Sequence, residues 1–261
     1  MHVLRAAFIV IGLAVVARSL AQCEVRIPPG APTWLNAVQR EGERGGAPLY
    51  VVPTVVHVYY GGDLLPIGIL QVQDWLAQCN ADLRGWSEQI GDVVPEFAGI
   101  VGDMNVELRL ATRDEQGDCM SGIRYHAYDP GQGNPPVLEN TLDTRHYLNI
   151  HVAGGQSFAT LPAPVTDPYD ANDVIMITPS QASLEGHTLA HEVGHWCGLY
   201  HVWGTSPTTG DCGNDYIADT PTTDGSQLDC ILDQSECAPP IVENVQNFMD
   251  YSSCRIMFTQ G

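Results

Sequence analysis

The feature that most constrains this chain is the stretch 188–201, which contains the pattern HExxHxxGxxH. His191 and His195 are four residues apart, so a helix presents both imidazoles on one face, where they can bind one metal ion. Gly198 predicts a helix end in a backbone conformation that a Cβ atom disfavours, and this turn brings in His201 as a third nitrogen ligand. Three protein ligands leave one position open for water, which is the arrangement of catalytic rather than structural zinc.

Glu192 lies between the two helix histidines and is predicted to act as general base toward a water molecule on the metal. By chance, the full pattern occurs in about one chain in a hundred thousand of this length. The pattern therefore predicts a zinc hydrolase. The alternative is a binding or adhesion module with a structural or vestigial metal site, against which the complete ligand set argues. Other histidines lack such spacing, and we interpret them as ordinary core or surface residues: His57, His126, His146 and His151.

The first residues have the pattern of a secretory signal peptide. A short basic start precedes an apolar run over residues 6–16, and Ser19 and Ala21 are small residues suited to a cleavage site. We expect residues 1–21 to be removed and the protein to be secreted, because the apolar run is too short to span a bilayer. Residues 22–48 are rich in Pro, Gly and charge, and are expected to form an exposed arm or a short pro-segment.

The chain is strongly acidic, with 11 Lys+Arg against 31 Asp+Glu and a net charge of −20. Every basic residue is an arginine. This charge argues against nucleic acid and anionic membrane as partners, and it suits metal ions, basic peptides or a salty medium. Most of the carboxylates are expected only to keep the protein soluble. The sequence carries no signal for an oligomeric state.

Hydrophobic patterns predict strands first and the metal-binding helix later. Runs of β-branched and aromatic residues predict strands at 49–60, 106–111, 122–128, 147–152 and 174–178. Helical spacing of apolar residues predicts helices at 69–83 and 184–201. After residue 201 the sequence is rich in Gly, Pro, Thr, Asp and Cys, with little regular structure. We therefore predict an α+β fold with a catalytic domain at 49–261, divided into an upper lobe, 49–201, and a lower lobe, 202–261.

A second motif lies about fifty residues after the zinc pattern, where Asn247 to Tyr251 reads NFMDY. Metzincins place a Met-turn beneath the metal at such a position, so Met249 is the predicted Met-turn residue. With these motifs the chain resembles the pappalysin family of metzincins, including its smaller archaeal, bacterial and fungal members. The resemblance runs over about 51–258, and its other pieces are VVHV from Val55, SFATLP from Ser157 and DTP from Asp219.

The resemblance implies a twisted five-stranded mixed sheet with a backing helix and an active-site helix in the upper lobe, above an irregular, disulfide-stapled lower lobe. It implies a secreted zinc endopeptidase whose extended protein or peptide substrates pair along an edge strand at Phe158, Ala159 and Thr160. Tyr251 matches a tyrosine that in some metzincins approaches the zinc and steadies the oxyanion; the alternative is a buried tyrosine lining the pocket. The chain stops at Gly261 without the closing helix expected of this lobe, so we expect a fragment or an unusually short member.

Two further features of the lower lobe follow from the resemblance. It implies interleaved disulfides Cys212–Cys237 and Cys230–Cys254. It also implies calcium in this lobe, where nine Asp/Glu and no basic residue lie between residues 211 and 250. Oxygen donors of this kind suit calcium, and the candidate ligands are Asp215, Asp219 and Thr220.

The chain also departs from the family's pattern. Cys197 takes a helix position that is usually aliphatic, and we hypothesise a cross-link to Cys79 on the backing helix; the alternative is a buried free thiol. Cys23 is expected either to pair with Cys119 or to act as a latency ligand on zinc. Relatives that cleave before Arg or Lys carry an acid between the Met-turn and the next cysteine, and this chain has none there. A basic preference after the scissile bond is therefore not carried over.

Overall fold

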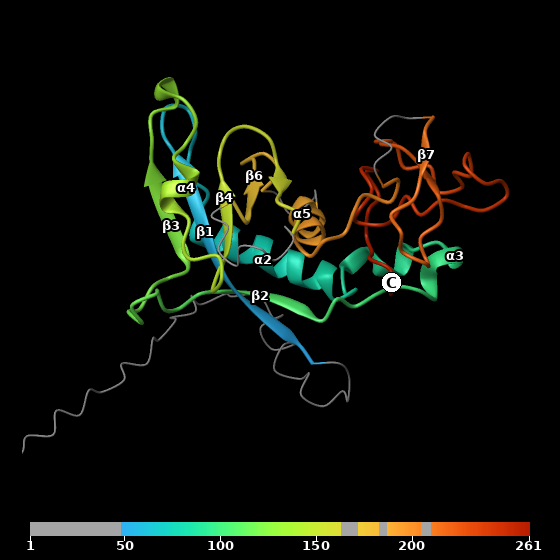
Figure 1. The fold of residues 1–261 in the computed structure, drawn as a ribbon, viewed down its shortest axis with the longest axis horizontal. Coiled ribbons are helices and arrows are strands. Elements are labelled where there is room, and N and C mark those ends of the chain that lie inside the picture. The colour runs from blue at the N-terminus through green and yellow to red at the C-terminus, as the bar shows by residue number, and fades with distance from the viewer. Residues whose placement is uncertain (1–47, 163–171, 183–186, 205–209) are drawn as a thin grey trace, which may run out of the picture.

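The computed structural model describes residues 48–162, 172–182, 187–204 and 210–261. The predicted signal peptide, nearly all of the predicted arm, and Cys23 lie outside these residues. Figure 1 shows an elongated molecule, with a lobe built on a β-sheet at one end and a lobe formed largely by the C-terminal part of the chain at the other. Helix α5 (Thr188–Trp196) lies between the two lobes.

A mixed sheet forms the centre of the first lobe. Its order is β2-β1-β4-β6-β5, and β3 also pairs with β1. Strand β5 is antiparallel to β6, and the other pairs are parallel. Strand β1 is long enough for its first half to pair with β2 and its second half with β3, so the described sheet has six strands where five were expected. The strands are β1 (Tyr50–Tyr60), β2 (Val106–Leu110), β3 (Ile123–Ala127), β4 (Leu148–Val152), β5 (Phe158–Ala159) and β6 (Val174–Ile177).

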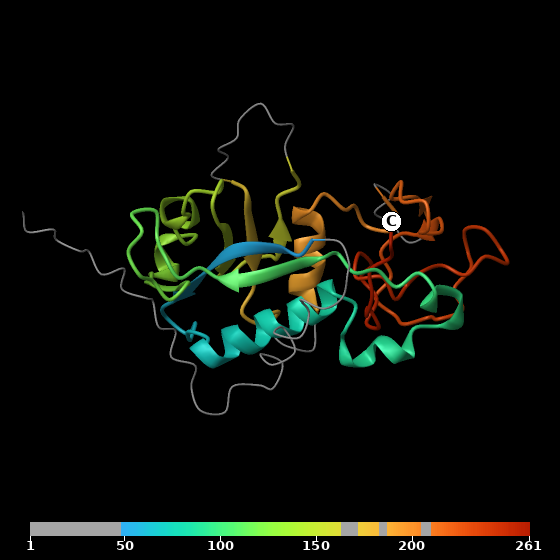
Figure 2. The same cartoon turned by 90° about the horizontal axis from the view of Figure 1, so that it is seen from below.

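Two helices cover one face of the sheet. Alternate strand residues point to this face, among them Val56 and Val58 on β1 and Ile150 on β4, all fully buried. They pack against α2 (Ile69–Leu83), which runs along the sheet in Figure 2, and against α5. Each Å² of apolar surface removed from water stabilises the fold by about 25 cal/mol, so this layer is the main source of stability for the lobe.

The opposite face of the sheet carries a polar layer. His57, His126 and His151, with Tyr59 and Asn149, form what we call the histidine layer; the rings of His57 and His151 stack with centroids 4.4 Å apart. The connection from β3 to β4 lies over it and contains η3 (Pro130–Gln132) and α4 (Val137–Asn140). The interpretation of His57 and His151 as core histidines is confirmed, because both side chains are fully buried.

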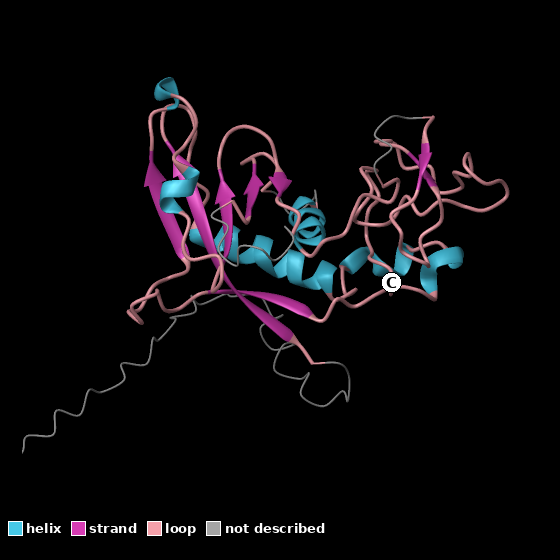
Figure 3. Ribbon diagram, viewed as in Figure 1, coloured by secondary structure: helices cyan, strands magenta, loops and turns pink. Residues whose placement is uncertain are grey.

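The second lobe is almost entirely loop, apart from the short pair β7 (Cys212–Gly213) and β8 (Thr223–Asp224) (Figure 3). The segments η2 (Glu88–Asp92) and α3 (Pro95–Ala98) pack against it, with Phe97 in one apolar cluster with Ile256 and Met257. This lobe is therefore built from two separate parts of the chain, not from residues 202–261 alone. Within the described part of the chain, no helix has the length and apolar character needed to cross a membrane.

Helix α5 is shorter than the predicted helix at 184–201. It begins after His187, whose backbone is left-handed with φ of 47°, and it ends at Trp196. Residue Gly198 has φ of 97°, which ends the helix because a left-handed residue cannot continue it. The predicted start at residue 184 lies outside the described residues.

Candidate active site: three histidines at helix α5

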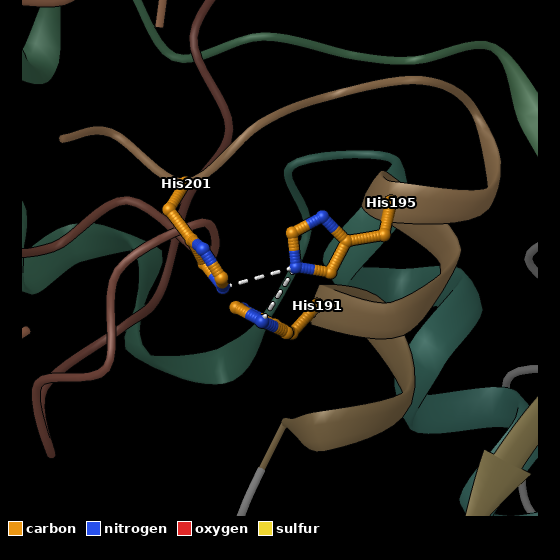
Figure 4. A group of neighbouring side chains, drawn as sticks. All are labelled: His191, His195 and His201. Atoms are coloured by element: carbon orange, nitrogen blue, oxygen red, sulfur yellow. Dashed lines mark hydrogen bonds between the residues drawn. The ribbon is translucent and has the colours of Figure 1, made fainter. Parts of the chain in front are cut away.

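The three predicted ligands meet at one point. Helix α5 presents His191 and His195 on adjacent turns, and His201 reaches them from the loop that follows (Figure 4). The Nε2 atom of His195 lies 3.1 Å from the Nε2 atoms of both His191 and His201. Within the described ranges, this is the only cluster of three or more His, Cys, Asp or Glu side chains placed to hold a metal ion.

The outer ring nitrogens show which tautomer each helix histidine adopts. His191 Nδ1 lies 2.6 Å from the carbonyl oxygen of Phe248, and His195 Nδ1 lies 2.8 Å from that of Leu199. A carbonyl only accepts, so each Nδ1 carries the proton and each Nε2 turns a lone pair toward the cluster. Carbonyls behind the ligands are typical of zinc histidines.

Burial keeps the three imidazoles neutral. It is the main cause that lowers the pKa of His191 well below its ordinary value, that of His195 below it, and that of His201 to about 3. Neutral imidazoles are the form that binds a metal. Three lone pairs converging in a half-buried site therefore fit a divalent cation, and three nitrogen donors suit zinc.

The backbone after the helix places the third histidine. The left-handed turn at Gly198 reverses the chain, as the sequence predicted, and the ring of Trp203 then stacks on His201 with centroids 4.7 Å apart. Trp203 is nearly fully buried. The indole therefore fixes the orientation of the imidazole from behind, a role that the spacing of the motif does not reveal.

Met249, the predicted Met-turn residue, packs against helix α5, which carries His191 and His195. Its side chain is buried and packs on Gly194, the residue immediately before His195. A Cβ atom on Gly194 would lie 2.3 Å from Met249 Sδ and 3.2 Å from Phe258 Cε1, closer than real contacts allow. Glycine at this position therefore lets the turn support the helix from below.

Replacing Gly194 with Ala is expected to lower the free energy of unfolding by about 1–2 kcal/mol. The loss should appear even though alanine is a better helix former by about 1 kcal/mol. Urea unfolding measures it, with Gly99→Ala as control, because Gly99 has ordinary helical dihedrals and no atom within 4 Å of an added Cβ. Equal midpoints for the two variants would show that the contact between Met249 and the helix is loose.

Glu192 lines the same cleft as the three histidines. It is buried, and its Oε2 atom has no hydrogen-bond partner among the described residues. Burial raises the pKa of Glu192 to about 7, against the opposing effects of Arg255 and of the Ala159 backbone N–H. A buried carboxyl oxygen left without a protein partner is suited to bind a water molecule or a substrate group.

These residues form the floor of a cleft of about 540 Å³. Tyr251 is 40% exposed on its rim, so it is not the buried tyrosine of the alternative interpretation, and its ring meets His201 edge-on at 4.7 Å. Phe158 and Ala159 of β5 form one wall, and Thr160 continues the pairing with β6 through a bond to Val174. The predicted edge strand thus borders the predicted metal site.

The sequence did not reveal two charged groups at this site. Arg255 lines the cleft, and its Nη1 atom donates to the carbonyl oxygen of Asp250 at 3.1 Å. Behind the helix, Asp82 on α2 meets His187 with 2.8 Å between Oδ2 and Nδ1, and both side chains are largely buried. This contact ties α2 to the start of α5. Neither group belongs to a local motif: the fold alone brings Arg255 to the cleft, and Asp82 and His187 are 105 residues apart.

The cysteines agree with the resemblance in part. Disulfides join Cys212 to Cys237 and Cys230 to Cys254, as expected, with sequence separations of 25 and 24. Loops of this size stabilise a fold by about 3 kcal/mol each. Cys119 is disulfide-bonded, and the expected partner Cys23 lies outside the described residues.

The hypothesis of a link between Cys79 and Cys197 is wrong for this structure, because both are free. Cys79 is buried on α2, whereas Cys197 is exposed just after α5. Burial in the apolar layer between the helices raises the pKa of the Cys79 thiol, which therefore behaves as a small core residue.

The three calcium candidates lie near one another in the second lobe. Asp215 and Thr220 line a cavity of about 190 Å³, and burial raises the pKa of Asp215. Asp219 Oδ1 and Thr220 Oγ1 are buried without a hydrogen-bond partner among the described residues. Orphaned oxygens beside a buried carboxylate fit a hard cation, which takes oxygen ligands.

Comparisons with known proteins place the chain in a family. The model of peptidase family M43, described as pregnancy-associated plasma protein-A, matches residues 132–261. An extracellular metalloprotease of Sordaria macrospora is 42% identical over 133 residues, and one of Neurospora crassa is 32% identical over 133 residues. Each match covers 46% of this chain and 45% of the relative, so the chain spans less than half the length of these curated relatives.

Solved structures extend the likeness to most of the chain. Mature mirolysin of Tannerella forsythia, in complex with a cleaved peptide, has a TM-score of 0.70 at 27% identity, covering 82% of this chain and 89% of that one. Promirolysin of the same organism gives a TM-score of 0.70 at 27% identity, covering 87% and 82%. The fold, the histidine cluster and the sequence matches agree. The chain belongs to the pappalysin family of metzincin metallopeptidases.

Proposed function

We propose that this chain is a secreted zinc endopeptidase that hydrolyses extended proteins or peptides. The observation that carries the proposal is the buried Glu192 carboxyl, which lines the cleft beside three converging imidazoles and whose Oε2 has no hydrogen-bond partner among the described residues. A purely structural metal site has no use for an orphaned carboxyl oxygen, because leaving it buried costs free energy. Relatives named extracellular metalloproteases and the disulfides of the second lobe support secretion.

The edge of the sheet positions the substrate. Strand β5 is two residues long and lies at the end of the sheet order, next to the cleft. An extended peptide that pairs with Phe158 and Ala159 adds a strand to the sheet and lies across the histidine cluster. Main-chain pairing of this kind holds any sequence, so the side chains that line the cleft must provide selectivity.

Glu192 moves the proton during hydrolysis. The chemistry that zinc supplies when bound by His191, His195 and His201 is Lewis acidity toward water and toward a peptide carbonyl. The Glu192 carboxylate accepts a proton from the attacking water, whose oxygen bonds to the carbonyl carbon, and then delivers that proton to the leaving amine. Tyr251 lies on the rim beside His201, where its hydroxyl can donate to the oxyanion.

Chelation tests the proposal directly. Purified protein loaded with zinc should cleave casein and quenched peptides, lose this activity with 1,10-phenanthroline, and regain it when zinc is restored. His195→Ala should lose both bound zinc and activity. If correctly folded, zinc-loaded protein leaves every polypeptide intact, the chain is instead a binding module with a structural metal site.

Calcium is proposed for the second lobe, with Asp215, Asp219 and Thr220 supplying oxygens. Calcium at about a hundredfold excess over its Kd should raise the free energy of unfolding by about 2.7 kcal/mol at constant zinc. Asp215→Asn should remove most of this response in urea titrations. Asp229→Asn is the matched control because Asp229 is exposed in the same lobe. A response unchanged in Asp215→Asn would exclude this site.

A further inference from the structure

Arg255 is unusual in this chain because of where its charge lies. Residues 146–261 contain fourteen Asp and Glu but a single Lys or Arg, which is Arg255. That one permanent positive charge lines the cleft of the candidate active site. In the earlier part of the chain, Arg109 pairs with Glu107 and Arg145 pairs with Asp143, both away from this cleft.

The backbone around Arg255 is firmly held. Cys254, immediately before it, is bonded to Cys230, and Ile256 and Met257, immediately after it, are buried. The guanidinium is anchored to the carbonyl oxygen of Asp250 at 3.1 Å. A guanidinium has five N–H donors in a planar fork, so it can serve this carbonyl and a carboxylate at the same time.

The rest of the cleft lining is nearly uncharged. Apart from the histidines, only Glu192 and Arg255 carry charge among the described residues that line it. Apolar side chains on the rim are partly exposed: Phe158, Leu161, Tyr200, Leu228 and Tyr251. Since Glu192 is committed to the proton, Arg255 is the charged side chain of this lining that can contact a substrate carboxylate in addition to its protein partners.

We propose that Arg255 makes this peptidase selective for substrates with one Glu or Asp close to the scissile bond, among apolar neighbours. The proposal rests on the peptidase function proposed above. It also limits the substrate class, because the chain's net charge of −20 repels polyacidic peptides. The favoured substrate is an otherwise neutral or basic segment with a single carboxylate that reaches Arg255.

A different role for Arg255 would be to support Glu192 electrostatically. The two roles predict different results. An electrostatic role changes the rate for every peptide by the same factor, whereas recognition changes the ratio between a Glu peptide and its Gln counterpart.

The test uses quenched peptides that are neutral around the scissile bond, with Glu, Gln or Lys placed in turn at two positions on each side. Wild-type enzyme should prefer Glu over Gln at one of these positions by about tenfold or more in kcat/KM, as expected of a charge-assisted hydrogen bond. Arg255→Met should bring this ratio close to one. Arg255→Glu should favour the Lys peptide, a gain that misfolding cannot produce.

Arg109→Met is the matched control, because it removes the same charge from β2 at the far edge of the sheet from β5. It should keep the wild-type ratio. Equal rates on Glu and Gln peptides in the wild type, or an equal loss on both in Arg255→Met, would overturn the proposal.

A measurement of peptide binding distinguishes a failure of this inference from a failure of the proposed function. Zinc-loaded Glu192→Ala should bind the preferred Glu peptide about tenfold more tightly than the Gln peptide in fluorescence anisotropy. Discrimination in binding without any cleavage by the wild type would refute the peptidase function and retain the selectivity of Arg255. Cleavage without discrimination in either measurement would refute the selectivity of Arg255 and retain the peptidase function.

Discussion

Replacing Glu192 with Gln is expected to lower peptide hydrolysis on the order of a thousandfold while the zinc content stays unchanged. The two side chains have the same shape, so the buried position between His191 and His195 remains filled. An amide cannot accept a proton from water, and it cannot return one to the leaving amine. Binding of uncleaved peptide should be retained, because the walls of the cleft are untouched.

Three measurements on the same preparation make this result interpretable. Atomic emission gives the zinc content, urea unfolding gives the stability, and quenched peptides give kcat/KM. His191→Ala is the contrasting variant, because it should lose zinc and activity together. Glu96→Gln, at an exposed position in α3, should behave as wild type. If Glu192→Gln keeps more than about a tenth of the wild-type rate, another group moves the proton.

The candidate metal site was predictable because its chemistry is local. Two histidines one turn apart and a glycine that ends the helix fix the ligand geometry within eleven residues, and the structure confirms both. Strands and helices with strong periodicity were also predictable; α2 (Ile69–Leu83) has the predicted bounds. In each case the signal depends on neighbours in sequence.

The second lobe was less predictable because polar contacts between distant residues hold it together. Glu243 is buried there and accepts bonds from the Asp224 and Cys237 backbone N–H groups and from Gln234 Nε2. The Gln246 side chain bonds to the backbone of Val94 and Asp92, which lie 152 and 154 residues earlier. No periodic pattern records such contacts, which is also why the packing of η2 and α3 against this lobe was missed.

Charged groups at the site were missed for the same reason. Arg255 follows a disulfide cysteine with no motif around it, and only the fold brings it to the cleft. The hypothesis of a Cys79–Cys197 link was wrong because it placed two side chains on facing helices without fixing their rotation. The structure buries Cys79 against the core and leaves Cys197 exposed.

The histidine layer is a structural feature that the sequence also did not reveal, and its hydrogen bonds determine its protonation. The Asn149 amide nitrogen donates to the carbonyls of Leu142 and Tyr147, so its oxygen accepts from His57 Nε2 at 3.0 Å. His57 Nδ1 must then accept from His126 Nε2 at 3.0 Å. A proton on His57 Nδ1 would therefore break this bond.

The partners of His151 determine its state in the same way. Thr141 donates its hydroxyl proton to the carbonyl of Val137, so its oxygen accepts from His151 Nε2 at 3.2 Å. His151 Nδ1 then accepts from the Tyr59 hydroxyl at 3.3 Å. Both buried histidines are thus bonded in their neutral forms, and burial lowers the pKa of His57 to about 4 and that of His151 to about 2.

These pKa values make the fold sensitive to acid. As pH falls from about 6.5 to about 4, His57 in the unfolded chain takes up a proton while folded His57 does not, so folding stability falls. His57 alone should contribute a loss of about 3 kcal/mol by pH 4. Nearby charge acts in the same direction, because His126 and Arg124 also lower the pKa of His57.

Buried carboxyls with raised pKa values, such as Asp250, gain stability over the same pH range, so the wild-type curve is a sum of opposing terms. The measurement is therefore a difference between the wild type and His57→Gln, taken from urea unfolding at saturating zinc. At pH 7 the variant should be less stable, because it loses ring packing and one hydrogen bond. Between pH 7 and pH 4 the difference should shift by about 3 kcal/mol in favour of the variant, since glutamine has no proton to gain.

His146→Gln serves as the control, because the His146 side chain is 67% exposed and lies outside the histidine layer. Its curve should run parallel to that of the wild type. A His57→Gln curve that is also parallel would show that His57 is protonated in the folded protein at pH 4. The hydrogen bonds from Asn149 and His126 would then have to rearrange at acid pH, because in the described geometry His57 has no acceptor for a second proton.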